Sequence, residues 1–215
     1  MNADFTPQAT PDSDPDSGLR DRLADGVAAE AAFEGWSRTA LATAATKLDL
    51  PAGEAERLFP GGAIEILAWL SDRSDRRTAE DMEREGVVQL KIRERIRKAV
   101  QIRIGRHGGE REAVRRGLAL LAFPLNAPLG LKLLYRTVDS LWYAAGDTSA
   151  DFNFYTKQAT LAGVYSSTVL YWLNDRLEGS EATWAFLDRR IDDVMKVEKW
   201  KGEFRERRAA WRGRR

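Results

Sequence analysis

The chain has no cysteine and one histidine, His107, and these two shortages exclude several kinds of chemistry. Disulfide bonds and thiolate metal sites both require cysteine. A single histidine rules out multi-histidine metal sites and argues against histidine-assisted nucleophilic catalysis. The Glu-x-x-His pairs of helical di-iron sites are absent as well. We therefore predict no catalytic residue, no metal site and no cofactor other than a bound lipid.

The chain also lacks a long apolar run and an excess of charge of either sign. No stretch of roughly 18 apolar residues occurs, so no transmembrane helix is predicted. Its 34 Lys and Arg residues nearly balance 33 Asp and Glu residues, which is not typical of a general nucleic-acid binder. The polar, acidic N-terminus is neither a secretory signal nor an Arg-rich transit peptide. This composition fits a reducing, cytoplasmic location.

Both ends of the chain differ in composition from the middle. Residues 1–17 hold three Pro and four Asp and are predicted to be a disordered acidic tail. Residues 199–215 form a basic aromatic tail, and from Lys196 onward nine Lys or Arg face three Glu. Interleaved cations and aromatic side chains are typical of a helix at a membrane surface. The predicted membrane contacts are Trp200, Phe204 and Trp211.

Between the tails, apolar residues recur at helical spacing throughout, which predicts an all-α protein. Helices are expected from Leu19 to Gly35, over 37–48 and 51–58, and from Ala63 to Leu70. A charged connector, 71–77, should precede one long helix over 79–104. Further helices are expected over 110–123, 129–145, 152–173 and 181–197. We divide them into an N-terminal part, 18–75, and a C-terminal part, 76–198.

The N-terminal part contains the stretch GWSRTALATAATKLDLPAGEAERLFPGGAIEIL, which resembles the helix-turn-helix of TetR-type regulators. That resemblance implies a TetR-like helical bundle. A recognition helix normally offers cations and amides to DNA. Here it carries Glu54 and Glu56, with only Arg57 and Lys47 close by. We expect no DNA binding, because phosphate contacts supply much of DNA affinity.

The C-terminal part contains helices that are apolar on most sides. Two prolines, Pro124 and Pro128, end the segment 117–123 and fix a bend. Helices of this kind are buried or border an apolar cavity. We predict a ligand cavity between the segments 117–123, 129–145 and 152–173. Its expected lipid-binding residues are Leu118, Leu121, Phe123, Leu134, Tyr135, Val138 and Tyr165.

The segment Thr137–Asp175 concentrates aromatic residues around an acidic turn. It contains four Tyr, two Phe and two Trp. It predicts two helices, with Gly146 stopping the first and Asp147, Ser149 or Asp151 capping the second. More large side chains occur than one core needs, and the excess near an exposed turn indicates a binding site for a partner.

The combination WYAAGDTSADFNFYTKQ, followed by TWAFLDRRIDDVM, resembles the ubiquinone-biosynthesis accessory lipid-binding family, whose fold is TetR-like. The resemblance covers residues 19–197. It implies a non-catalytic protein that binds an isoprenoid or other lipid at the membrane surface and presents substrate to the di-iron demethoxyubiquinone hydroxylase. The family's docking surface corresponds here to Asp139, Leu141, Trp142, Asp147, Asp151, Phe154, Tyr155 and Lys157.

Phe154 stands where relatives often have Trp, so aromatic character is kept without the indole donor. The absence of a transit peptide points to a bacterial member, peripheral on the inner face of the cell membrane.

TetR-type folds commonly form homodimers through their last two helices, so a homodimer is expected. The alternative function is a TetR-type transcriptional regulator with an apolar effector. An enzyme is disfavoured, since adjacent acids such as Asp192 and Asp193 diverge on a helix.

Overall fold

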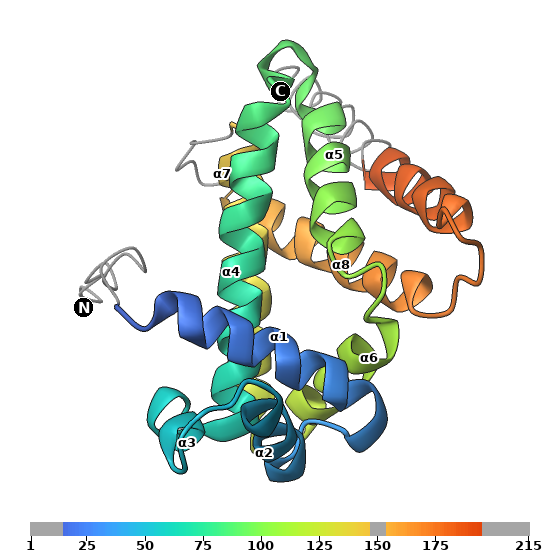
Figure 1. Cartoon of the computed structure of the whole chain (residues 1–215). Coiled ribbons are helices and arrows are strands. Elements are labelled where there is room, and N and C mark those ends of the chain that lie inside the picture. The colour runs from blue at the N-terminus through green and yellow to red at the C-terminus, as the bar shows by residue number, and fades with distance from the viewer. Residues whose placement is uncertain (1–14, 147–153, 195–215) are drawn as a thin grey trace, which may run out of the picture. The chain divides into compact units, whose positions relative to one another are not determined.

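The computed structural model describes residues 15–146 and 154–194, without the side chains of Val88, Phe154 and Tyr155. The regular structure in these ranges is helical, which confirms the predicted all-α class (Figure 1). The helices are α1 (Ser17–Glu34), α2 (Arg38–Lys47), α3 (Glu54–Leu58), α4 (Gly62–Arg84), the 3-10 helix η2 (Val87–Gln89), α5 (Ile92–Gly105), α6 (Arg111–Ala122), α7 (Ala127–Ala144), α8 (Phe154–Trp172) and residues 181–194. Within the described ranges, no helix is both long and apolar enough to cross a bilayer.

The chain divides into two compact units. The N-terminal unit comprises Met1–Arg73 and Gly109–Leu131, and the C-terminal unit comprises Ser74–Gly108 and Lys132–Arg215. The first boundary lies close to the predicted one at residues 75 and 76. Unlike the prediction, the structure places α6 in the N-terminal unit.

The N-terminal unit is built around α1, which packs against α2 and α6, while α2 packs against α3 (Figure 1). Ser37 caps α2, and its Oγ accepts a hydrogen bond from the Ala40 backbone N–H at 3.1 Å. Apolar side chains at helical spacing fill the core, among them Leu23, Val27, Leu41, Phe59 and Ile66. The helix-turn-helix arrangement therefore rests on an ordinary amphipathic pattern.

Close contact explains why α6 belongs to this unit. Gly117 is buried, and a Cβ atom there would lie 2.9 Å from Leu67 Cδ2 and 3.2 Å from Trp36 Nε1. The Trp36 indole N–H donates to the carbonyl of Ala113 at 2.8 Å. A side chain larger than hydrogen at position 117 would push α6 away from Trp36 and Leu67.

The predicted charged connector at 71–77 is wrong, because α4 continues through it to Arg84. Two of its charged residues, Arg73 and Asp75, are buried, whereas Arg77 is exposed. Arg73 is largely buried and donates to the Asp25 carboxylate. Thr78 lies inside α4, and its hydroxyl donates to the Ser74 carbonyl at 2.7 Å. The break comes later, at Gly86 and η2, so the predicted helix over 79–104 is two helices.

A buried polar cluster joins three helices of the C-terminal unit. Arg103 on α5 donates from Nε to Asp75 Oδ1 on α4 at 2.7 Å. The hydroxyl of Thr137 on α7 donates to the other oxygen, Oδ2, at 3.0 Å. All three residues are buried. Removing one member of such a pair leaves an uncompensated buried charge, which costs about 3–5 kcal/mol.

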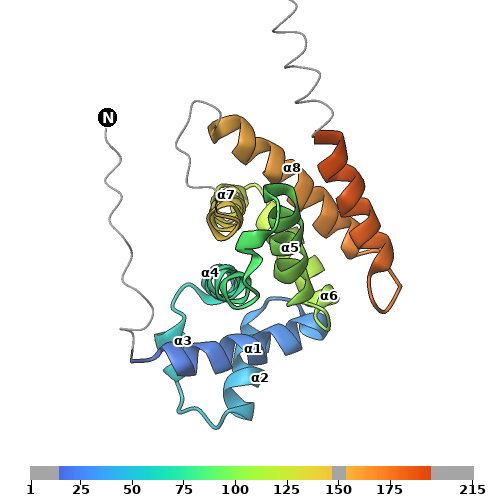
Figure 2. The ribbon, with the colours of Figure 1, turned by 90° about the horizontal axis from the view of Figure 1, so that it is seen from above.

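The basic face of α5 contacts acidic side chains. Arg93 lies 3.4 Å from Asp192, and Arg97 lies 2.5 Å from Asp188, so ion pairs join α5 to the helix over 181–194. Figure 2 shows the backbones of both helices. Lys98 pairs with Glu85 at 2.7 Å. These contacts give the basic face of α5 a structural role.

Candidate functional site

The candidate site begins where α7 ends. Gly146 has a positive φ of 80°, and this left-handed conformation stops a helix. Arg95 Nη1 donates to the Ala145 carbonyl at 3.2 Å, which places a cation at the negative end of the helix dipole. A Cβ atom at position 146 would lie 3.0 Å from that same Nη1. Glycine therefore suits the conformation, and a larger residue would also require the Arg95 side chain to shift.

One face of α7 is buried and the opposite face is exposed. The buried face holds Leu133, Thr137, Val138 and Leu141. Residues four apart share a face of a helix, and the exposed face holds Tyr135, Asp139 and Tyr143, the last with 69% of its surface accessible. An acidic side chain between two exposed tyrosines is a polar and aromatic surface typical of protein interfaces.

The start of α8 extends this face. Gln158 Nε2 donates to Asp139 Oδ1 at 3.0 Å. Lys157 Nζ lies 5.9 Å from the centre of the Trp142 ring, within the range of a cation–π contact. Trp142 Nε1 and Gln158 Oε1 are buried and have no hydrogen-bond partner among the described residues. We call Tyr135, Asp139, Trp142, Tyr143 and Lys157 the α7–α8 surface.

The predicted partner-binding residues fall into three groups. Asp139, Trp142 and Lys157 lie on the α7–α8 surface. Leu141 is a core residue with 1% of its surface exposed, which corrects its assignment to a docking surface. Asp147 and Asp151, together with the side chains of Phe154 and Tyr155, lie outside the described residues.

Sequence reasoning missed Tyr143 as a surface residue. Its position four residues after Asp139 was the available signal. Tyr135 was also expected elsewhere, in the wall of a lipid cavity.

The predicted lipid-binding residues also differ in environment. Val138 is buried, and Leu121, Leu134 and Tyr165 are partly buried. Burial raises the pKa of the Tyr165 phenol. Leu118, Phe123 and Tyr135 are exposed, which corrects their assignment to the wall of an enclosed cavity. The predicted membrane residues Trp200, Phe204 and Trp211 lie outside the described residues.

A separate groove of about 590 Å³ lies at the C-terminal end of α8. Its lining mixes polar and apolar side chains: Ser167, Leu170, Tyr171, Asn174, Asp175, Arg176 and Ala182. Beside it, the ring of Tyr171 stacks on Phe186 with centroids 4.6 Å apart. The groove and the α7–α8 surface thus lie at opposite ends of α8.

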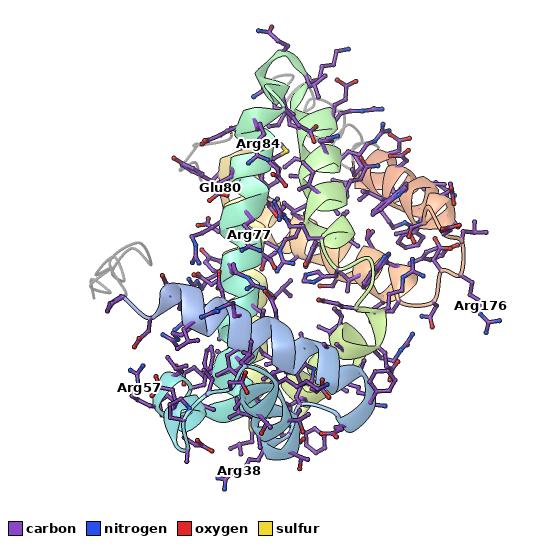
Figure 3. All side chains as sticks on the ribbon, viewed as in Figure 1. Arg38, Arg57, Arg77, Glu80, Arg84 and Arg176 are labelled. Atoms are coloured by element: carbon purple, nitrogen blue, oxygen red, sulfur yellow. The ribbon has the colours of Figure 1, made fainter. Side chains whose placement is uncertain are left out.

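The recognition position of the helix-turn-helix offers little to DNA. Arg57 on α3 pairs with Glu54 at 2.7 Å and with Asp16 at 2.6 Å. Arg38 and Arg57 point outward (Figure 3), but Glu56 is exposed on the same short helix as Arg57. The Asp16 contact also shows that the end of the predicted disordered tail is ordered. Within the described ranges, no three metal-ligating side chains gather into a possible metal site.

Comparison with known proteins bears on the site directly. The COQ9 family model matches residues 127–198, which include all of α7 and α8. The chain carries the COQ9 family region. The α7–α8 surface lies inside it, and the resemblance noted in the sequence is confirmed.

Similar proteins include mitochondrial ubiquinone biosynthesis proteins named COQ9. The Xenopus tropicalis protein is 36% identical over 167 residues, which cover 75% of this chain and 53% of the relative. The human protein is 35% identical over 169 residues, covering 76% and 53%. The chain thus spans about half the length of the curated relatives it matches.

A solved structure supports the fold. A TetR transcriptional regulator from Nitrosomonas europaea superposes with a TM-score of 0.69 and 24% sequence identity. The match covers 81% of this chain and 97% of that one. The predicted TetR-like fold is confirmed, and this likeness carries no further statement about function.

Proposed function

We propose that the chain is a non-catalytic accessory protein of ubiquinone biosynthesis. In this proposal it binds an isoprenoid or other lipid and presents substrate to the di-iron demethoxyubiquinone hydroxylase. It does so as a peripheral protein on the inner face of a bacterial cell membrane.

The observation that carries the proposal is the α7–α8 surface. It lies within the COQ9 family region, and it exposes two tyrosines beside a charged residue and a partly buried indole. Solvent-exposed aromatic residues cost free energy in water and are enriched at interfaces. The residues match the chemistry of a protein partner better than that of a reaction, since they hold no nucleophile with an adjacent base.

Co-purification of the full chain with the hydroxylase tests the docking step. We expect Tyr143→Lys to weaken the association by at least tenfold, because a central interface tyrosine is worth about 2 kcal/mol or more. Phe33→Lys is the matched control, since Phe33 is an exposed aromatic residue in the other unit. Equal retention of hydroxylase by both variants, with unchanged helix content, would refute the docking role of the α7–α8 surface.

Native mass spectrometry of the purified chain, followed by lipid extraction, tests the lipid-binding step. We expect an isoprenoid quinone or a phospholipid to co-purify in a defined ratio. Tyr165 and Val138, which are at least partly buried, are the predicted lipid-binding residues to alter first. A ligand-free protein that takes up no added isoprenoid would contradict this step while leaving the docking step untouched.

We further propose a homodimer formed through the C-terminal end of α8. Leu170, Tyr171 and Leu177 are large apolar residues that stay exposed there. Large exposed apolar groups near one another are typical of an association surface. Because this set lies at the opposite end of α8 from Lys157, a dimer leaves the α7–α8 surface available.

A further inference from the structure

The corner between α6 and α7 exposes large apolar side chains in the N-terminal unit. Phe123 is 65% exposed, Leu125 is 91% exposed and Leu131 is 68% exposed. The first two flank Pro124, and the third follows early in α7. We call these three residues the apolar corner. Isolated exposed leucines are common on proteins, whereas such a group at one turn marks a contact with an apolar phase or partner.

The corner is fixed by its own hydrogen bonds. The Asn126 side-chain amide donates to the Leu120 carbonyl at 2.9 Å, and its backbone N–H donates to the Phe123 carbonyl at 2.8 Å. The Gly130 N–H donates to the Asn126 carbonyl at 3.0 Å, which begins α7. A Cβ atom at Gly130 would lie 3.1 Å from the Leu121 carbonyl oxygen, so the two helix ends are in close contact. The apolar corner is therefore ordered while its side chains face solvent.

The charges along the chain near the corner all have one sign. No Asp or Glu occurs anywhere from Ala113 to Val138, although 31% of the whole chain is charged. The same stretch contains four cations: Arg115, Arg116, Lys132 and Arg136. Glu112 pairs with both Arg115 and Arg116 at one end. Lys132, the residue that follows Leu131, is exposed. Arg116 also donates to the Phe33 carbonyl. Lys132 is the cation next to the corner in sequence, and its charge favours contact with an anionic surface.

We propose that the apolar corner inserts into the interfacial region of an anionic lipid bilayer. Phe123, Leu125 and Leu131 would enter the boundary between headgroups and acyl chains, and Lys132 would contact lipid phosphates. Apolar side chains backed by cations are the combination that binds peripheral proteins to such surfaces. A projecting turn, with Leu125 exposed almost completely, suits a fluid layer better than the concave surface of a folded partner.

This contact is additional to the basic aromatic tail. It shares the membrane location of the proposed function but rests on separate residues, all of them outside the α7–α8 surface. The experiment therefore has to distinguish the corner from the tail and from the hydroxylase.

Sedimentation of the full chain with phosphatidylcholine vesicles, with and without phosphatidylglycerol, measures the contact. We expect Leu125→Glu to weaken binding to the anionic vesicles by about tenfold, since an apolar side chain can no longer leave water. Phe33→Glu is the control and should bind like the unaltered chain. Phe33 is 84% exposed, but Glu30 and Glu34 lie close to it in sequence.

A fluorescent label gives a second reading that does not depend on affinity. Because the chain has no cysteine, Leu125→Cys provides a unique attachment point for an environment-sensitive dye. We expect a blue shift of the emission when anionic vesicles are added. The same dye attached at Phe33→Cys should keep the emission that it has in water.

Three results would overturn the proposal. The first is unchanged binding of Leu125→Glu both to vesicles and to the hydroxylase, which would leave the tail as the membrane contact and the proposed function intact. The second is an equal loss of binding to anionic vesicles in Leu125→Glu and Phe33→Glu. The third is unchanged vesicle binding by Leu125→Glu combined with lost hydroxylase association, which would assign the corner to a protein partner.

Discussion

Leu141 and Tyr143 stand two residues apart on α7 in opposite environments. The side chain of Leu141 lies in the core, whereas that of Tyr143 is mostly exposed. Residues two apart on a helix point in different directions. A substitution at either position would disturb hydroxylase binding in the proposed function, but for different physical reasons. Measurements of the free energy of unfolding distinguish these two reasons.

We expect Leu141→Glu to lower the free energy of unfolding by about 4 kcal/mol or more, because it removes a buried apolar side chain and introduces an unpaired charge. Tyr143→Glu should change it by no more than about 0.5 kcal/mol, the usual range for surface substitutions. Urea unfolding followed by circular dichroism measures both. A stable Leu141→Glu protein would show that this side chain can leave the core.

The ends of α7 and α8 determine what the candidate site can contact. Arg95 reaches the Ala145 carbonyl, which lies between the end of α7 and Gly146. On α8, Lys157 and Leu170 lie roughly 20 Å apart along the helix axis. In the proposed function, one helix would thus contact the hydroxylase at its first turn and a second copy of the chain near its last.

Two glycines, one just after the end of α7 and one inside α8, give a matched pair of substitutions. At Gly146 the backbone φ is positive and a new Cβ would meet Arg95. We expect Gly146→Ala to destabilise the protein by about 1 kcal/mol or more, because Ala is strained in that conformation. Inside α8, a new Cβ at Gly163 would have no atom within 4 Å. Gly163→Ala should therefore stabilise the protein by up to about 1 kcal/mol.

Thermal unfolding followed by circular dichroism gives the change in Tm for both glycine variants. Changes in Tm of equal sign would contradict the proposed role of Gly146.

At the scale of the whole molecule, periodicity was enough to predict an all-α chain and most helix bounds. Periodicity failed at 71–77, where a charged run indicated a connector, although Arg73 and Asp75 are themselves buried and have partners in other helices. The site could be predicted only in part. The sequence correctly predicted that Asp139 and Trp142 lie on one surface. It did not show which side of α7 Leu141 faces, because apolar residues occur on both sides of that helix.

The proposed homodimer leads to a prediction about molecular mass. We expect Leu170→Glu to convert the protein to a monomer at micromolar concentration, because a charge would replace an apolar contact on both sides of a symmetric interface. Sedimentation velocity measures the change, and Tyr143→Glu serves as the control that should remain dimeric. A monomeric unaltered chain would exclude this interface.

The buried Asp75, Arg103 and Thr137 cluster has a consequence for how the C-terminal unit folds. Apolar side chains on α4, α5 and α7 could pack in several registers at similar cost, since hydrophobic contact is not directional. The carboxylate and the guanidinium meet in only one of them. A compact state with α5 shifted by one turn would hold two separated charges away from water, at a cost of several kcal/mol. We therefore expect the cluster to raise the free energy of misassembled states and to select one arrangement of the three helices during folding.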